Sequence, residues 1–236
     1  MTGAVVGRST SSMVKLLVKH WVQSSEQLVY VFGGDEREGY VASTIQGVNR
    51  VPHVVAGPTV RLAEKHRTSP VPMKALRGGA FMGDELVHDP GLWGLVQAAT
   101  PTDVAVRFGD NLTAAGNASF VAVSSHRVGV VVETEHLHTE TAQSAPEEPA
   151  EGFSLLGAAK SVVRGVTSLG GDAPDNPVTC GFEVQMNVIR EIAPVPMGRS
   201  GKPLRFLRFW FADGSSLSIK HPEAERTADT IRQNIR

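Results

Sequence analysis

The sequence of 236 residues contains a single cysteine, Cys180. One cysteine cannot form an intramolecular disulfide, and it cannot supply the thiolate cluster that holds a structural zinc ion. No apolar run approaches the roughly 18 residues that cross a bilayer, and the stretch at 13–22 is interrupted by Lys15, Lys19 and His20. These absences favour a reducing compartment, so we expect a cytoplasmic protein, either free or peripheral at a membrane.

The sequence also lacks a basic excess and the standard catalytic motifs. Lys and Arg number 23 against 24 Asp and Glu, whereas nucleic-acid binders usually carry extra cations that neutralise phosphates. No glycine-rich phosphate loop ending in Lys-Ser or Lys-Thr occurs, and no nucleophile elbow positions a serine. His136 and His138 could share one face of a strand, but no spacing adds a third metal ligand. We therefore expect no nucleic-acid partner, cofactor, metal or catalytic residue.

The letters GGDE at 33–36 begin the signature of cyclic-dinucleotide synthases. Phosphoryl transfer needs cations held by positioned acids, yet Glu26 is the only acid among the 32 residues that precede these letters. Arg37 also follows where the signature has Phe. A strand at 26–32, a turn at the glycines and a return strand at 39–45 explain the stretch better, because such residues favour chain reversals.

Hydrophobic periodicity predicts the other elements. Met13, Leu16 and Leu17 repeat at steps of three and four, which predicts a helix at 12–22. Asp213-Gly214 is typical of a tight hairpin turn. The remaining expected elements are a helix at 89–99, a strand at 103–108, two strands within 118–133, a strand at 178–192, a hairpin at 203–220 and a helix at 221–236.

Three stretches in the second half carry a family resemblance. In FVAVSSHRVGVVVE, Ser124 begins a turn and Arg127 opens the next strand. VIREIAPVP spaces Ile189, Ile192 and Val195, and RFWFADGSSLSIK contains the pattern aromatic-x-Asp-Gly. In this order they resemble the bacterial PH-like domains, relatives of pleckstrin-homology and GRAM domains. The resemblance implies an α+β fold, in which antiparallel strands form a barrel or sandwich closed by a C-terminal helix.

The resemblance also implies a division of the chain and a class of function. Residues 1–88 would form an N-terminal extension with a helix and a hairpin, and residues 89–236 the PH-like domain. Members of the family are mostly binding modules for membrane lipids, peptides or protein partners. Those that bind phosphoinositides carry several cations in and after their first strand, where this sequence offers Arg107. Strong inositol-phosphate binding is therefore not expected.

An insertion at 134–177 interrupts the resemblance. It begins as an acidic linker and continues into a stretch at 153–169, where one arc of a helical wheel is apolar and the opposite arc is cationic. Such a face suits a membrane surface or a partner groove, although most amphipathic helices pack on their own protein. The residues that we expect to make this contact are Phe153, Leu155, Leu156, Lys160, Val163, Arg164 and Val166.

A second group of cations, Lys202, Arg205 and Arg208, offers further basic contacts near the last hairpin. Arg205 and Arg208 have opposite parity, so a regular strand would point them to different faces. Our leading hypothesis is a non-enzymatic binding and recruitment module for an anionic membrane surface or a protein partner. The alternatives are a structural subunit, including a homo-oligomer assembled through a sheet edge, and a small enzyme with a site between the two halves.

Overall fold

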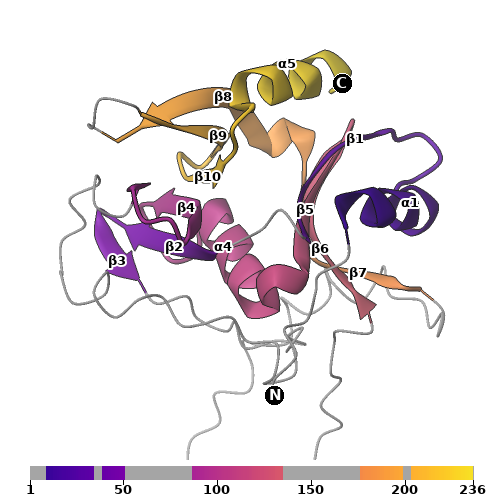
Figure 1. Cartoon of the computed structure of the whole chain (residues 1–236), viewed down its shortest axis with the longest axis horizontal. Helices are drawn as coiled ribbons and strands as arrows, with labels where there is room; N and C mark the ends of the chain where they lie inside the picture. Colours follow the sequence, from indigo (N-terminus) through magenta and orange to yellow (C-terminus); the bar gives the residue numbers. More distant parts are fainter. Residues whose placement is uncertain (1–8, 35–38, 51–86, 135–175, 199–202, 236) are drawn as a thin grey trace, which may run out of the picture.

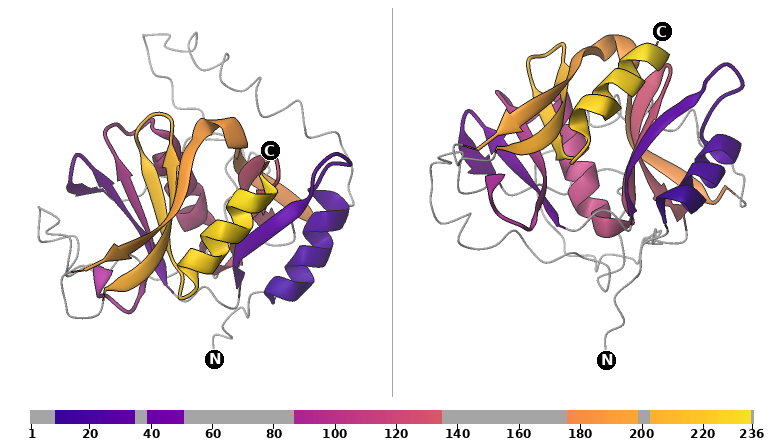
Figure 2. Two further views of the ribbon diagram at one scale, coloured as in Figure 1. Left: turned by 90° about the horizontal axis from the view of Figure 1, so that it is seen from above. Right: turned by 45° about the horizontal axis from the view of Figure 1, so that its top comes forward.

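The computed structural model describes residues 9–34, 39–50, 87–134, 176–198 and 203–235. In these ranges the chain forms two β-sheets that stand at an angle to each other (Figure 1). One α-helix lies between the sheets, a second lies over one end of the gap, and a third lies outside the smaller sheet (Figures 1 and 2). None of these helices is long and apolar enough to cross a membrane.

The smaller sheet, called sheet A, is antiparallel in the order β1-β5-β6-β7, and only β5, β6 and β7 follow one another in the chain. Strands β5 and β6 are buried along their whole length. Helix α1 (Thr10–His20) covers one face of the sheet, and the core between the sheets covers the other. Strands covered on both faces become almost continuously apolar. The bounds are Leu28–Gly33 for β1, Ser119–Ser124 for β5, Arg127–Glu133 for β6 and Val178–Gln185 for β7.

The larger sheet, called sheet B, has the order β3-β2-β4-β10-β9-β8. Its pairs are antiparallel except for β2 with β4. A short 3-10 turn, Met186–Val188, carries the chain from β7 of sheet A into β8 of sheet B. The bounds are Tyr40–Ile45 for β2, Val48–Arg50 for β3, Leu92–Ala98 for β4, Ile189–Met197 for β8, Leu204–Phe211 for β9 and Ser216–Lys220 for β10.

Helix α4 (Val104–Ala115) fills the space between the sheets. Its Phe108 ring lies 5.0 Å from the ring of Phe182 in sheet A and 5.5 Å from that of Phe211 in sheet B. A Cβ at Gly109 would lie 2.7 Å from a methyl carbon of Val96, so glycine is what lets the helix approach β4 closely. The core of the molecule therefore surrounds α4.

The first turn of α4 is capped from a distant part of the chain. The backbone N–H of Val104 donates to Asp213 Oδ2 at 2.7 Å, and that of Ala105 donates to Ser215 Oγ at 3.1 Å. The first N–H groups of a helix have no partner inside the helix and must find one elsewhere. The loop between β9 and β10 therefore completes the N-terminus of α4.

Helix α5 (Ala224–Asn234) lies over β8 and β9 and reaches β1 (Figures 1 and 2). Its buried stripe includes the predicted Ala224, Ala228 and Ile231. His221, just before the helix, lies with Nε2 3.1 Å from the Tyr30 hydroxyl and 2.8 Å from that of Thr227. These contacts join the start of α5 to sheet A.

Several predicted elements are confirmed, namely the first and last helices, the two strands within 118–133 and the hairpin of β9 and β10. The last loop is longer than a two-residue turn, because the Phe211 N–H donates to the Ser215 carbonyl across it. Gly214, with φ of 85°, holds the left-handed position in that loop. The predicted strand at 178–192 is two strands, which the turn at Met186–Val188 divides between the sheets.

Three predictions are wrong. The strands at 26–32 and 39–45 exist but form no hairpin, because β1 pairs with β5 in sheet A and β2 pairs with β3 and β4 in sheet B. The stretch at 89–99 contains strand β4 rather than a helix. The stretch at 103–108 begins helix α4 rather than forming a strand, so Arg107 lies on a helix.

The α+β class and the C-terminal helix are confirmed, but the strands form no closed barrel. Within the described ranges no strand of sheet A pairs with a strand of sheet B. Side chains of α4 occupy the space between the inner faces, which keeps the sheets apart. Strands β1 and β2 come before residue 88, and they pair with β5 and β4, which come after it. Both sheets therefore contain strands from both parts of the chain.

Candidate functional site

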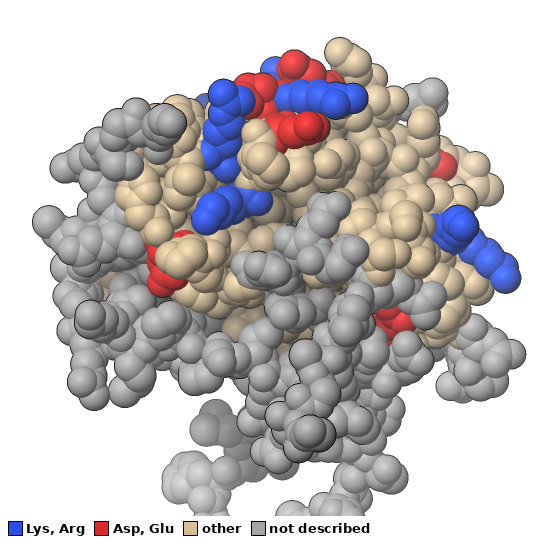
Figure 3. Space-filling model, viewed as in Figure 1, with Lys and Arg blue, Asp and Glu red and all other residues tan. Residues whose placement is uncertain are grey.

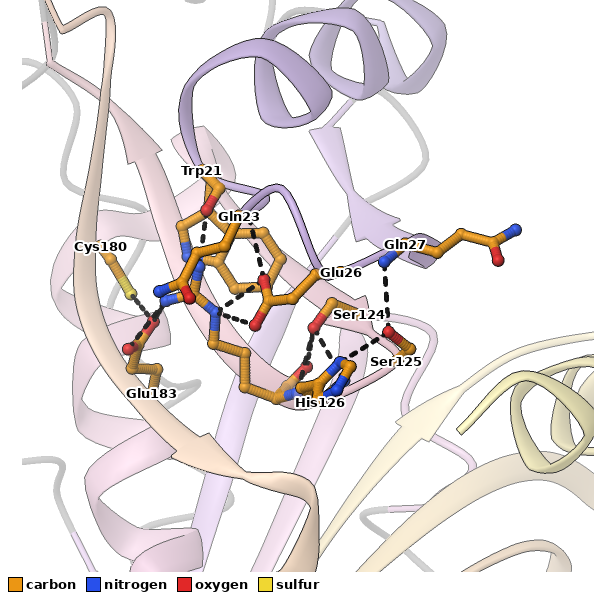
Figure 4. Close-up of polar contacts among 10 residues, drawn as sticks. Trp21, Gln23, Glu26, Gln27, Ser124, Ser125, His126, Cys180 and Glu183 are labelled. Carbon is orange, nitrogen blue, oxygen red and sulfur yellow. Dashed lines mark hydrogen bonds and ion pairs between the residues drawn. The ribbon is translucent and has the colours of Figure 1, made fainter. Parts of the chain in front are cut away.

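The densest polar cluster described lies at one end of sheet A, around Arg127 (Figure 4). Three segments meet there: the connection between α1 and β1, the turn between β5 and β6, and strand β7. They bring Trp21 and Glu26, Arg127, and Glu183 together from distant parts of the sequence. We call these four residues the Arg127 cluster.

The guanidinium of Arg127 is engaged on every side. Its Nε lies 3.1 Å from Glu26 Oε1, its Nη1 lies 2.8 Å from Glu183 Oε2, and its Nη2 donates to the Trp21 carbonyl at 2.6 Å. The ring of Trp21 lies beneath the guanidinium carbon at 4.6 Å, a cation–π distance. All three nitrogens therefore have acceptors inside the protein.

The burial of these charged side chains indicates that they stabilise the fold. The side chains of Arg127 and Glu26 are 7% and 5% exposed, and that of Glu183 is 21% exposed. Buried charges are tolerated when they are paired and hydrogen-bonded. Two carboxylates surround one cation, so the cluster offers no positive charge to an incoming phosphate. Arg127 fastens the α1–β1 connection to the sheet instead of binding an anion.

The turn that leads into Arg127 is fixed by the serine that the family resemblance singled out. Ser124 Oγ accepts hydrogen bonds from the N–H groups of His126 at 3.2 Å and Arg127 at 3.0 Å. The next residue, Ser125, donates its N–H to the Gln27 carbonyl at 2.9 Å. These bonds hold the turn against the start of β1 and aim Arg127 at its partners.

Ser125 also contacts the neighbouring histidine, with Oγ 2.8 Å from His126 Nδ1. A serine–histidine contact is the first requirement of a serine nucleophile. Here the same oxygen accepts the Gln27 N–H at 3.2 Å, and Ser125 is only 5% exposed. The contact therefore serves the turn, because a reacting group could hardly reach the oxygen.

Cys180 lies beside the cluster on β7, and its Sγ donates to Glu183 Oε2 at 3.5 Å. Burial, followed by the nearby Glu183 carboxylate, raises the pKa of the thiol to about 12. The thiolate is the form that attacks electrophiles and binds metals. At neutral pH this cysteine therefore stays protonated and does neither.

The structure separates the cations that the sequence grouped near the last hairpin. Arg205 forms an exposed ion pair with Glu225 of α5 at 2.7 Å. Arg208 donates from Nε to Ser218 Oγ at 3.0 Å, and burial lowers its pKa. The two side chains have different neighbours, as their opposite parity predicted, and do not form one patch. The other predicted contacts, Lys202, Phe153, Leu155, Leu156, Lys160, Val163, Arg164 and Val166, lie outside the described residues, as do His136 and His138.

The N-terminal helix, which the sequence favours as a core-packing element with Lys15 and Lys19 on its polar side, also has an exposed surface. Val14 and Val18 of α1 are 36% and 56% exposed, and Lys15 and Lys19 beside them are also exposed. Figure 3 shows cationic side chains along the outer margin of this side of the molecule. The sequence indicates this surface, because the apolar stripe that predicts the helix does not include the two valines and leaves them on the opposite side of α1. We call Val14, Lys15, Val18 and Lys19 the outward face of α1.

Within the part of the chain that the structure describes, no group of three or more His, Cys, Asp and Glu residues is arranged to hold a metal ion. Comparison with known proteins found no matching family model, no similar curated protein and no similar solved structure.

Proposed function

We propose that the chain is a non-enzymatic recruitment module of the PH-like type that docks on an anionic membrane surface through the amphipathic stretch at 153–169. The family assignment rests on the order of the three stretches in the sequence. The structure adds mainly antiparallel strands in two sheets and a C-terminal helix. Fold alone does not fix function, so the proposal rests on the insertion and on the surface that carries it.

The observation that carries the proposal is the closed base of the insertion. Thr134 donates its N–H to the Pro177 carbonyl at 2.9 Å and its hydroxyl to the Asn176 carbonyl at 2.7 Å. Glu133 pairs directly with Val178 across β6 and β7. The two ends of the insertion are therefore held together by the sheet itself, so a much shorter loop could connect β6 to β7.

The composition of the stretch at 153–169 supports the choice of a membrane. An apolar arc that includes Leu155, Val163 and Val166 lies opposite Lys160 and Arg164 on a helical wheel. An apolar face buries among acyl chains while cations meet anionic headgroups. Gly157 and Gly165 weaken an isolated helix by roughly 1 kcal/mol each, which fits a segment that becomes helical on contact.

Co-sedimentation with vesicles tests the proposal. The intact chain is expected to bind vesicles that contain phosphatidylserine and to bind phosphatidylcholine vesicles weakly. A variant in which 153–169 is scrambled keeps composition and charge but loses the apolar arc, and it is expected to lose most of the binding. Equal binding by both proteins would remove the insertion from the mechanism.

The structure bears on assembly through a sheet edge. Strand β8 is an outer strand of sheet B and carries Pro194 and Pro196, which have no N–H to donate to an added strand. This edge is therefore poorly suited to pairing with a second copy. Size-exclusion chromatography with light scattering would reveal a homo-oligomer that forms in another way.

A further inference from the structure

We infer that the outward face of α1 is a second docking surface for anionic lipid headgroups. The inference rests on the proposed recruitment to an anionic membrane, but it concerns different residues and a different element. It can therefore fail while the role of the insertion stands.

Helix α1 is held rigidly by its inner side. Met13 and Leu17 are fully buried against sheet A, and Trp21 at the end of the helix lies under Arg127. At the other end, the Thr10 hydroxyl donates to the Gly33 carbonyl at 3.3 Å. Because both ends and the inner stripe are fixed, the outward face keeps one orientation and needs no ordering when it binds.

The outward face combines apolar and cationic groups. Val14 and Val18 are one helical turn apart and stay 36% and 56% exposed. Lys15 and Lys19 run beside them at the same spacing, and four residues is one of the separations that bring side chains together on a helix. Apolar side chains flanked by lysines match a surface with anionic headgroups above acyl chains.

The charged side chains of α1 itself, Lys15 and Lys19, have one sign. The chain has no acidic residue before Glu26, and Glu26 is held by Arg127. Among the residues that the structure describes, neither Lys15 nor Lys19 takes part in an ion pair. A lysine without a counter-charge keeps its full attraction for a negative surface, whereas a paired one has lost most of it.

The position of α1 on the sheet also suits contact with a membrane. The helix lies on the outside of sheet A, with its outer side uncovered by the described elements (Figures 1 and 2). Its first turn is next to Gly33, which pairs with Phe120, and the same row continues through Val131 to Cys180. The last pair before the insertion, Glu133 with Val178, lies two residues beyond that row, so the base of the insertion is near the first turn of α1.

Vesicle binding by the intact chain, with paired substitutions, tests the inference. Each lysine near an anionic leaflet changes affinity about fivefold, so K15Q/K19Q is expected to bind phosphatidylserine vesicles roughly 30-fold more weakly. V14S/V18S is expected to weaken binding as well, by removing the apolar contact. The control for net charge is R226Q/R232Q on α5, which removes two exposed cations that pair with Glu223 and Asp229, and it is expected to bind normally. Thermal unfolding confirms that each variant is folded.

Each outcome separates the two proposals. Parental binding by K15Q/K19Q, or equal weakening by R226Q/R232Q, overturns the inference and leaves the insertion untouched. Loss of binding in K15Q/K19Q with full binding by the scrambled 153–169 variant upholds the inference and overturns the role of the insertion. No binding of the intact chain to anionic vesicles overturns both.

Discussion

The Arg127 cluster and the outward face of α1 lie on the same side of sheet A, and they use positive charge in opposite ways. Arg127 is buried, and all its nitrogens have partners inside the protein. Lys15 and Lys19 are exposed, and neither has an ion pair within the described ranges. A cation is available to a ligand only when the protein has not already neutralised it. The residue that the family resemblance marks therefore stabilises the fold, while Lys15 and Lys19 remain without a counter-charge among the described residues.

Removing the guanidinium should have the largest effect. In R127M, Glu26 and Glu183 lose their counter-charge in a poorly hydrated site, so the free energy of unfolding is expected to fall by about 3–5 kcal/mol. Urea denaturation measures this loss. R205M is the control, because it breaks an exposed pair, with side chains 59% and 52% exposed, and should cost less than about 1 kcal/mol. Similar costs for both variants would mean that Arg127 fastens nothing.

The cysteine beside the cluster gives the second test. A rise in thiol pKa from 9.0 to about 12 lowers the thiolate fraction near neutral pH about a thousandfold. Reaction with a disulfide reagent at pH 8 should be slower by a similar factor in the folded protein than in urea. The raised pKa also predicts a stability contribution that is complete below pH 9 and is lost as the pH rises toward 12. Fast labelling of the folded protein would show that the cluster opens readily.

The two carboxylates should not be equivalent. Glu26 is less exposed than Glu183, and it lies in the connection that Arg127 fastens to the sheet. E26Q is therefore expected to cost about 2 kcal/mol, within the range for hydrogen bonds to charged groups, and E183Q less. Thermal unfolding of the two variants ranks them. The reverse order would place the main attachment on β7 instead of on the connection.

The smallest effect on stability is expected at the outward face of α1. K15Q/K19Q removes exposed charges that have no partner within the described structure, so the free energy of unfolding should change by less than about 0.5 kcal/mol. The same urea titration measures it. A large fall in the free energy of unfolding would mean that these lysines stabilise the fold, as Arg127 does.

The sequence predicted strands well where a turn signal lies between them and poorly where none does. Two short apolar runs around a polar turn located β5 and β6, and Asp213-Gly214 located the last hairpin. Strand β4 is buried from Leu92 to Val96 without a break and has no such turn, so periodicity could not distinguish it from a helix. Asp89 does not cap a helix there, because its Oδ1 accepts the Gly91 N–H in a turn at 2.7 Å. At 103–108 six residues look alternating, and the helical repeat emerges only with Leu112 and Ala115.

The candidate site was predictable in part. The family resemblance pointed to Ser124 and Arg127, and local spacing is enough to explain the turn between them. Their partners were not predictable, because Glu26 lies 101 positions and Glu183 56 positions from Arg127. Hydrophobic periodicity gives no information about contacts between residues so far apart in the sequence. The outward face of α1 was readable from the helical stripe, although its exposure required the fold.

The cap on α4 has a consequence for the order in which the protein matures. Val104 and Ala105 receive their hydrogen-bond acceptors from Asp213 and Ser215, more than a hundred positions later in the chain. Contacts of such separation form slowly, because a long loop must close first. During synthesis, the central helix therefore emerges long before the loop that completes it. The molecule can reach its final state only after its C-terminal hairpin has left the ribosome.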